Sequence, residues 1–221
     1  MALRVAFDLD GVLADLATEI ERCRDEIVGH ATARLPVSQS LERRVWQHVE
    51  TIENFWERLN ELEPGAVSRL AAIAADSRWE IIFLTTRPAT AGETVQVQSQ
   101  RWLQSKGFPL PSVYVVPGSR GKVAAALALD AVVDDRLENC LDVVADSKAR
   151  PILFLNSESL KNGLQGSADR LGIQTVETMV QCLEVLAEMD AAASDDPGIL
   201  KRVMGTIKEL RTLTASQVDP Q

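Results

Sequence analysis

The stretch "LRVAFDLDGVLAD", residues 3–15, joins a β-rich apolar run to three aspartates. Its apolar side chains are continuous rather than alternating, which is typical of a strand buried on both faces of a parallel sheet. The run ends at Asp8, and Asp10 and Asp15 follow it closely. Ionised carboxylates are costly to bury without partners, so their place at the end of a buried strand indicates a site rather than a packing element.

The composition is that of a globular protein. The chain has 221 residues, of which 46% are hydrophobic and 25% charged, enough to bury a sizeable core. Its net charge of −9 argues against a nucleic acid polymer or an anionic membrane surface as a partner. The three cysteines are far apart and form no metal-ligand pair, which is typical of reduced thiols. We expect a soluble, cytoplasmic protein, and the oligomeric state is left open.

Four further β-rich apolar runs follow the first, with helical patterns between them. They are "WEIIFLT" (79–85), "VYVV" (113–116), "AVVD" (131–134) and "PILFL" (151–155). Alternating strands and helices predict an α/β fold with a doubly wound, Rossmann-like parallel sheet of about five strands.

The first connection is much longer than a crossover requires, and it contains amphipathic helical patterns but no strand signal. We therefore predict a small helical cap over residues 15–74, inserted after the first strand. Residues 1–14 and 75–189 form the expected α/β core. Residues 190–221 begin with a linker-like composition and contain one helix-prone segment, 199–213, before a polar tail.

Polar residues stand at the tips of three predicted strands. They are Asp8 and Asp10, Thr85, and the pair Asp134–Asp135. Sites in open α/β sheets form at the carboxyl ends of strands, near the switch in strand order. Four converging carboxylates repel one another unless a cation lies among them, which predicts a hard divalent ion, most simply Mg²⁺.

A further positive charge is expected from Lys122, in "GSRGKVAAAL", at the predicted start of a helix. Four carboxylates exceed the combined charge of Mg²⁺ and one lysine by one negative charge. A phosphate dianion would then be disfavoured unless one carboxyl keeps its proton, which is the state that a general acid requires.

Four motifs in this order resemble those of the haloacid dehalogenase (HAD) superfamily in its phosphatase form. "FDLDGVLAD" is similar to its first motif, Asp-x-Asp-x-Val, and "IIFLTTRP", "GKVAAAL" and "AVVDDRLENC" are similar to the three that follow. Together they cover the α/β core, about two-thirds of the chain. Any one of these motifs alone is a weak signal, whereas their order along strands and helices is specific.

The resemblance implies a role for each aspartate. Asp8 is the expected nucleophile, which forms an aspartyl-phosphate, and Asp10 the expected general acid and base. Mg²⁺ is expected on Asp8, on the backbone carbonyl of Asp10, and on an acid of the late pair, with Asp135 favoured as the direct ligand and Asp134 as its support. The second aspartate, Asp10, favours phosphate-ester hydrolysis over dehalogenation.

The resemblance also implies that Thr85 and Lys122 bind the transferring phosphoryl group. Thr86 is an alternative to Thr85, because the register of a predicted strand is uncertain by one residue. Arg87 is in reach of a substrate phosphate or carboxylate.

The substrate is expected to be a small phosphorylated metabolite. "FWERLNELEPGA" in the cap and "TTRP" after the second strand are weakly similar to the 5'-deoxynucleotidases, which favours a nucleotide. A sugar phosphate remains the alternative within the enzyme class. The cap aromatics Trp46, Phe55 and Trp56 suit base stacking, although core packing is favoured for at least two of them.

Two other interpretations remain open. The first-motif aspartates are also common turn residues, and Asp15 in particular suits a helix N-cap. A non-catalytic phosphate-binding or regulatory protein is the alternative from another class. Response-receiver domains carry similar residues, but their paired acids come first and their lysine last, the reverse of the order here.

Overall fold

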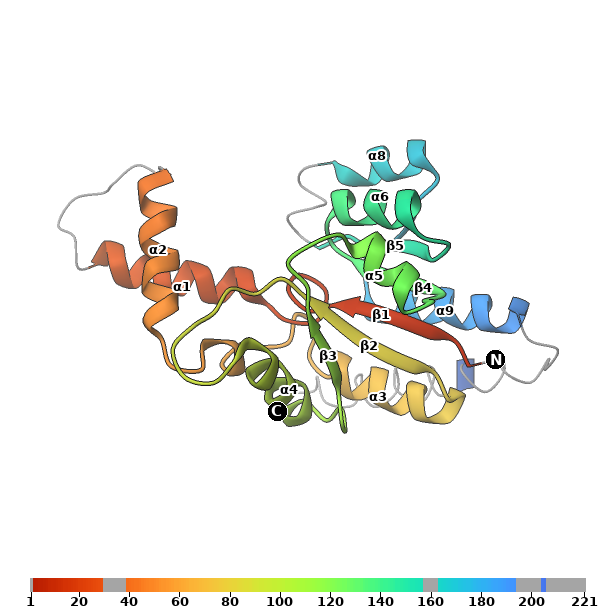
Figure 1. Cartoon of the computed structure of the whole chain (residues 1–221), viewed down its shortest axis with the longest axis horizontal. Coiled ribbons are helices and arrows are strands. Elements are labelled where there is room, and N and C mark those ends of the chain that lie inside the picture. The colour runs from red at the N-terminus through yellow and green to blue at the C-terminus, as the bar shows by residue number, and fades with distance from the viewer. Residues whose placement is uncertain (1, 30–38, 157–162, 194–203, 206–221) are drawn as a thin grey trace, which may run out of the picture.

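The computed structural model describes residues 2–29, 39–156, 163–193 and 204–205. A parallel six-stranded sheet in the order β3-β2-β1-β4-β5-β6 forms its centre (Figure 1). The strands are β1 (Arg4–Asp8), β2 (Glu80–Thr85), β3 (Ser112–Val115), β4 (Ala131–Asp134), β5 (Arg150–Phe154) and β6 (Gln174–Val176).

A helix follows every strand, which gives the α/β alternation. In chain order they are α1 (Leu16–Gly29), α2 (Gln39–Thr51), the 3-10 helix η1 (Phe55–Glu57), α3 (Ala66–Ser77), α4 (Val95–Ser105), α5 (Arg120–Ala126), α6 (Leu137–Asp146), α8 (Leu164–Leu171) and α9 (Met179–Ala193).

The sheet is covered on both faces, as the continuous apolar strands predict. Successive side chains of a strand point to opposite faces. Val5 and Phe7 of β1 accordingly lie in the cluster that also holds apolar residues of α3, α4 and α9, whereas Ala6 lies in a second cluster with residues of α5 and α6. Figure 1 shows α3 and α4 on one side of the sheet and α5 and α6 on the other. The predicted doubly wound α/β fold is confirmed.

The order of strands reverses beside β1, which pairs with β2 on one side and β4 on the other. Such a switch point opens a crevice at the carboxyl ends of the central strands. Asp8, Thr85 and Asp134 are the last residues of β1, β2 and β4, so the fold brings these three strand tips together.

The chain leaves β1 through a tight turn. Gly11 has a φ of 85° and donates its N–H to the carbonyl of Ala14 at 3.0 Å. A Cβ built on Gly11 would lie 2.1 Å from Oδ2 of Asp135, so this position has no room for a side chain. The turn leads into the α1–α2 pair, which projects from the end of the sheet (Figure 1).

Two elements at the far end of the sheet were not predicted. Strand β6 adds a sixth strand to the five expected, and α8 precedes it. At the C-terminal side, α9 continues to Ala193, into the segment expected to be a linker from residue 190. The helix expected at 199–213 lies outside the described residues, except for helical residues 204–205.

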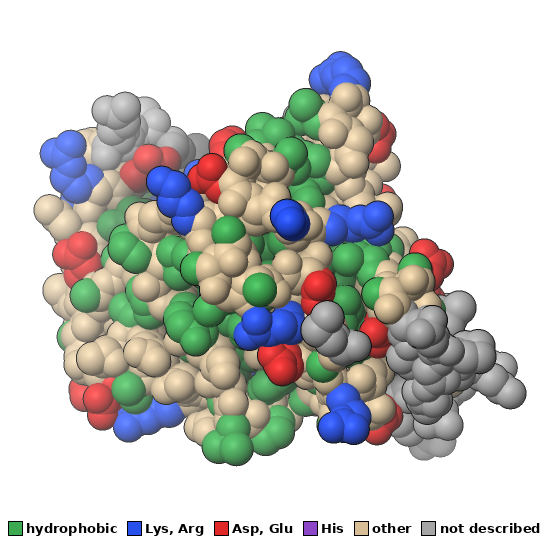
Figure 2. All heavy atoms as spheres, turned by 45° about the vertical axis from the view of Figure 1, so that its right-hand side comes forward, with side chains coloured by type: hydrophobic (Ala, Val, Ile, Leu, Met, Phe, Trp, Pro, Cys, Tyr) green, Lys and Arg blue, Asp and Glu red, His purple; other side chains and the backbone are tan. Residues whose placement is uncertain are grey.

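The surface carries mixed charge. On the face shown in Figure 2, basic and acidic side chains are interspersed with apolar ones and do not gather into one basic patch. Within the described part of the chain, no helix combines the length and apolar character needed to cross a lipid bilayer.

Candidate active site

A cavity of about 330 Å³ opens at the carboxyl ends of β1, β2 and β4. Six of the eight residues predicted for the site line it: Asp8, Asp10, Thr85, Thr86, Arg87 and Asp135. Asp134 lies immediately beside it, and Lys122 does not reach it. The cavity therefore lies at the switch point of the sheet, where the sequence predicted a site.

Asp8 ends β1 and is buried with both carboxylate oxygens occupied. Oδ1 accepts a hydrogen bond from Nη2 of Arg120, and Oδ2 accepts one from the backbone N–H of Asp10 at 3.0 Å. Burial raises the pKa of Asp8 well above its ordinary value, and the nearby charge of Asp134 raises it further, while the Arg120 guanidinium opposes both. A cation beside Asp8 is thus needed to keep it ionised.

Arg120, rather than Lys122, supplies the cation at this position. Helix α5 begins at Arg120 after the N-cap Ser119, and the Arg120 side chain is only 2% exposed. Two residues further on, the helix has turned by about 200°, so Lys122 faces solvent. The expectation for Lys122 is corrected here, because the phase of the helix places residue 120 over the site.

Asp10 has a cationic partner of its own. Nη2 of Arg87 lies 2.8 Å from Oδ1, and Nε lies 2.9 Å from Oδ2. A planar guanidinium that faces both oxygens of a carboxylate is the strong, bidentate form of this ion pair. Arg87 was expected to reach substrate, and the structure instead places its guanidinium on Asp10.

The late acidic pair divides into an inner and an outer member. Asp134 is buried, accepts two hydrogen bonds from Nδ2 of Asn139 at 2.9 and 3.0 Å, and lies 3.5 Å from Nε of Arg120. Asp135 faces the cavity and accepts from Nδ2 of Asn156 at 3.0 Å. Burial and the charge of Asp134 raise the pKa of Asp135 to about 7. Asp135 thus lies at the cavity and Asp134 behind it, and their predicted roles as direct and supporting metal ligands stay predictions.

The two threonines after β2 differ in exposure. Thr85 is 1% exposed, and its Oγ1 accepts from the backbone N–H of Arg87 at 3.3 Å, whereas Thr86 is exposed. Both line the cavity, so both remain candidates for contact with a phosphoryl group.

Several site residues were not predicted. Arg120, Asn139 and Asn156 contact the carboxylates, and Arg136 lines the cavity with a side chain that is 66% exposed. Asn139 lies five residues after Asp134, in the first turn of α6, which begins shortly after β4 ends. The contact of Asn156 with Asp135 joins different strand ends, and no local pattern indicates it.

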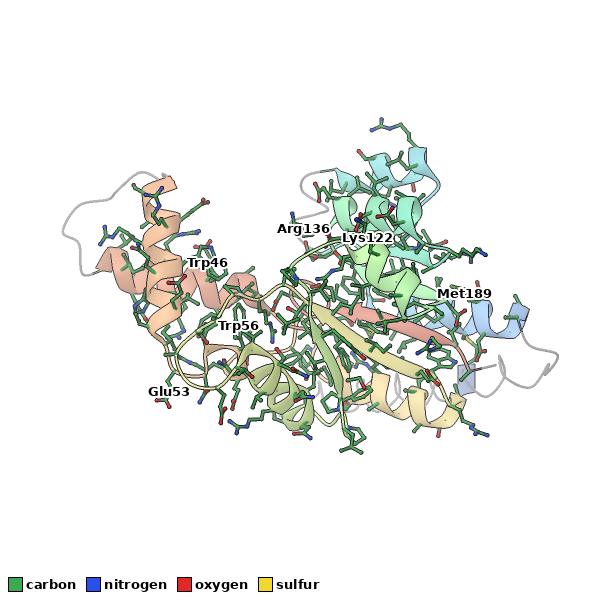
Figure 3. The ribbon with its side chains drawn as sticks, in the orientation of Figure 1. Trp46, Glu53, Trp56, Lys122, Arg136 and Met189 are labelled. Atoms are coloured by element: carbon green, nitrogen blue, oxygen red, sulfur yellow. The ribbon has the colours of Figure 1, made fainter. Side chains whose placement is uncertain are left out.

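The cap aromatics take two different positions. Phe55 and Trp56 are fully buried, as the favoured interpretation of core packing expected. Trp46, from α2, is only partly buried and lines the cavity. Figure 3 shows Trp46 and Arg136 on different sides of the gap between the α1–α2 pair and the sheet. Asp15 accepts from the backbone N–H of Thr18 at 3.1 Å, which is the contact of an N-cap at the start of α1.

A second group of potential ligands lies between α1 and α2. One ligand atom from each of Cys23, Glu26 and His48 lies within 4.8 Å of the others. Glu26 is already paired with Arg22 through Oε1, and its Oε2 lies 3.4 Å from Nε2 of His48. The carboxylate of Glu26 therefore already has two side-chain partners.

The donor set of the main site suits a hard divalent cation. Four carboxylates share two buried guanidinium groups, those of Arg87 and Arg120, and burial raises the pKa values of Asp8, Asp134 and Asp135. Oxygen ligands alone, with no sulfur or imidazole among them, favour Mg²⁺ or a similar ion.

Known structures share this fold. The chain is similar to a HAD family hydrolase from Deinococcus radiodurans R1 that holds bound phosphate and sodium, with a TM-score of 0.58 and 16% identity over 85% of this chain and 96% of that one. A hydrolase from Pseudomonas syringae gives a TM-score of 0.53 and 18% identity over 84% and 98% of the two chains. No protein-family model and no curated protein matches the sequence. The fold is thus that of the HAD hydrolases.

The position of Arg120 generates a prediction about stability. Arg120→Met removes the cation from two buried carboxylates, and we expect it to lower the free energy of unfolding by about 3 kcal/mol. Lys122→Met, two residues away on the exposed side of α5, is the matched control and should change it by less than about 0.5 kcal/mol. Urea denaturation of both variants without divalent ions measures the difference. Equal stability of the two variants would contradict the assignment of Arg120.

Proposed function

We propose that this protein is a Mg²⁺-dependent phosphatase of the HAD type that hydrolyses a small phosphomonoester through an aspartyl-phosphate. The observation that carries the proposal is the position of Asp8. It lies at the tip of the central strand, in the wall of a cavity, with Asp10, Thr85 and Asp135 around it. The fold shared with the hydrolase from Deinococcus radiodurans that holds phosphate supports the same class of ligand.

Asp8 is the nucleophile. One carboxylate oxygen attacks phosphorus, an Asp8–phosphorus bond forms, and the bond from phosphorus to the ester oxygen breaks. Arg120 keeps the carboxylate in place through Oδ1, and the backbone N–H of Asp10 fixes Oδ2. Thr85 and Thr86 line the cavity, and their hydroxyls bind the phosphoryl oxygens.

Asp10 transfers the protons. It gives a proton to the departing ester oxygen and then removes one from the water that attacks the aspartyl-phosphate, which regenerates Asp8 and releases inorganic phosphate. Both oxygens of Asp10 contact Arg87, which fixes the orientation of the carboxyl group in the wall of the cavity.

Asp8, Asp135 and the backbone carbonyl of Asp10 are the residues to hold Mg²⁺. The ion supplies the positive charge that a phosphate dianion needs to enter a site rich in carboxylates. With Arg87 and Arg120 counted, a bound Mg²⁺ would balance four ionised carboxylates, whereas Mg²⁺ with Lys122 alone would leave one negative charge.

The best substrate candidate is a small nucleotide. The cavity volume of about 330 Å³ suits a small metabolite, and the partly exposed ring of Trp46 in its wall suits stacking on a base. The exposed guanidinium of Arg136 suits an anionic or hydroxyl-rich substrate and equally favours a sugar phosphate, the alternative.

A hydrolysis panel tests this proposal. We expect phosphate release from 5'-nucleotides in the presence of Mg²⁺, above release from sugar phosphates. Asp8→Asn should lower kcat on the order of a thousandfold or more, because it removes the nucleophile. Asp15→Asn, in the same stretch but outside the cavity, is the matched control and should keep most activity. Undiminished hydrolysis by Asp8→Asn would disprove the nucleophile, and a preference for sugar phosphates would favour the alternative substrate.

The raised pKa of Asp135 generates a prediction about pH. In the metal-free protein, folded Asp135 holds a proton up to about pH 7, whereas the unfolded chain releases it near pH 4. The folded state binds more protons in this window, so its stability should fall from about pH 4 to about pH 7 and then level off. Asp135→Asn should reduce that slope, and the exposed Asp25→Asn should not.

Binding of Mg²⁺ should stabilise the protein more as the pH rises, opposite to the trend expected without the ion. Because protons compete with the ion for Asp135, Mg²⁺ should raise the melting temperature more at pH 8 than at pH 6. Thermal unfolding with Mg²⁺ or a chelator measures both effects. An equal shift at the two pH values, or an unchanged shift in Asp135→Asn, would exclude Asp135 as a ligand.

A further inference from the structure

Arg87 is a buried cation whose contacts join the cavity to the core. It follows β2 in the sequence "TTRP", and its side chain is 0% exposed. Its Nη2 and Nε face the two oxygens of Asp10, at 2.8 and 2.9 Å, and Nε also lies 3.2 Å from Oδ1. A buried charge is retained only where it is paired, so the pair with Asp10 accounts for the placement of Arg87.

The surroundings of Arg87 fix the direction of its guanidinium. Nη1 donates to Oγ of Ser99 at 2.9 Å. The guanidinium carbon lies 4.7 Å from the ring centroid of Trp56 and 5.9 Å from that of Trp102, within or near the range of a cation–π contact. Ser99 and Trp102 are three residues apart on α4 and so share one face of that helix.

The two tryptophans are themselves held by hydrogen bonds. Nε1 of Trp56 donates to the carbonyl of Pro88 at 3.0 Å, and Nε1 of Trp102 donates to the carbonyl of Leu59 at 2.7 Å. Both rings are fully buried. Buried, hydrogen-bonded rings therefore contact the guanidinium of Arg87, while Asp10, its ion-pair partner, is 18% exposed and lines the cavity.

We propose that Arg87 is a positioning residue that holds the carboxyl group of Asp10 in the orientation for proton transfer. This inference rests on the proposed phosphatase function. Two features favour this positioning role over substrate binding, which is the role expected for Arg87 from the sequence. Arg87 has no exposed side-chain area, and Nε, Nη1 and Nη2 each already donate to a protein oxygen.

The geometry allows the group to be held while it carries a proton. Oδ1 accepts from both Nη2 and Nε, whereas Oδ2 accepts from Nε alone. A proton on Oδ2 leaves Oδ1 bound to Arg87. As the bond between Asp8 and phosphorus forms and the phosphorus–ester oxygen bond breaks, that proton passes from Oδ2 to the ester oxygen. A displacement of about 1 Å in a catalytic group lowers a rate on the order of a hundredfold.

The leaving group gives the sharpest test, because a poor leaving group requires the proton and a good one does not. We would measure kcat/KM, which includes phosphoryl transfer to Asp8, for an alkyl phosphate and for p-nitrophenyl phosphate. Arg87→Met should lower the value for the alkyl phosphate about a hundredfold and that for p-nitrophenyl phosphate less than about tenfold. Arg101→Met, which removes an arginine that is 49% exposed from the same helix as Ser99, is the matched control and should change neither.

Three companion variants keep the test decisive. Ser99→Ala, which removes the Nη1 contact, should show the same dependence on leaving group at smaller size, and Arg87→Lys should recover part of the loss. Both report on the role if Arg87→Met does not fold. Adding Arg87→Met to Asp10→Asn should cost little beyond Asp10→Asn alone, because the two residues act as one unit.

The outcomes are distinct. Equal losses for both esters in Arg87→Met, Arg87→Lys and Ser99→Ala, or additive losses in the double variant, would overturn the role of Arg87 and leave the phosphatase intact. Absence of any hydrolysis by the wild-type protein would overturn the proposed function, and the role of Arg87 with it.

Discussion

Arg120 lies with its guanidinium between the carboxylates of Asp8 and Asp134, at the ends of two adjacent parallel strands. Both carboxylates are buried, and burial raises the pKa of each. Without a cation between them, the carboxylates of Asp8 and Asp134 would repel each other too strongly for both to be ionised. The proposed function depends on this contact, because it holds the carboxylate of Asp8 next to a second acid at the switch point of the sheet.

A second ion pair between an arginine and an aspartate lies closer to the cavity. Arg87 faces Asp10 as Arg120 faces Asp8, and each arginine comes from a different segment of the core. The remaining excess of negative charge lies on the side of Asp135, where the cavity opens. Arginines thus pair with Asp8, Asp134 and Asp10, while Asp135 faces the cavity, and this arrangement suits the proposed divalent ion and phosphoryl transfer.

Much of this could be predicted from the sequence, because the central strands are continuous apolar runs that end in carboxylates. The doubly wound α/β sheet and the grouping of Asp8, Asp10, Thr85 and Asp135 follow from that pattern. Strand β6 was missed because three residues at a sheet edge carry no clear apolar run. Lys122 was named and Arg120 was missed, because motif order fixes a segment but not the phase of its helix. The partner of Arg87 lies 77 residues away, and no local spacing encodes such a contact.

The central claim is that Asp8 carries the phosphoryl group during turnover. Acid quench of the protein within its first turnover of an accepted phosphomonoester, followed by peptide mass spectrometry, tests it directly. We predict one added phosphoryl group on the peptide that contains Asp8, more of it in Asp10→Asn, where loss of the general base slows its hydrolysis, and none in Asp8→Asn. Two results would contradict the account. One is phosphate release with no covalent phosphoryl group on the wild-type protein or on Asp10→Asn, and the other is a phosphoryl group on a residue other than Asp8.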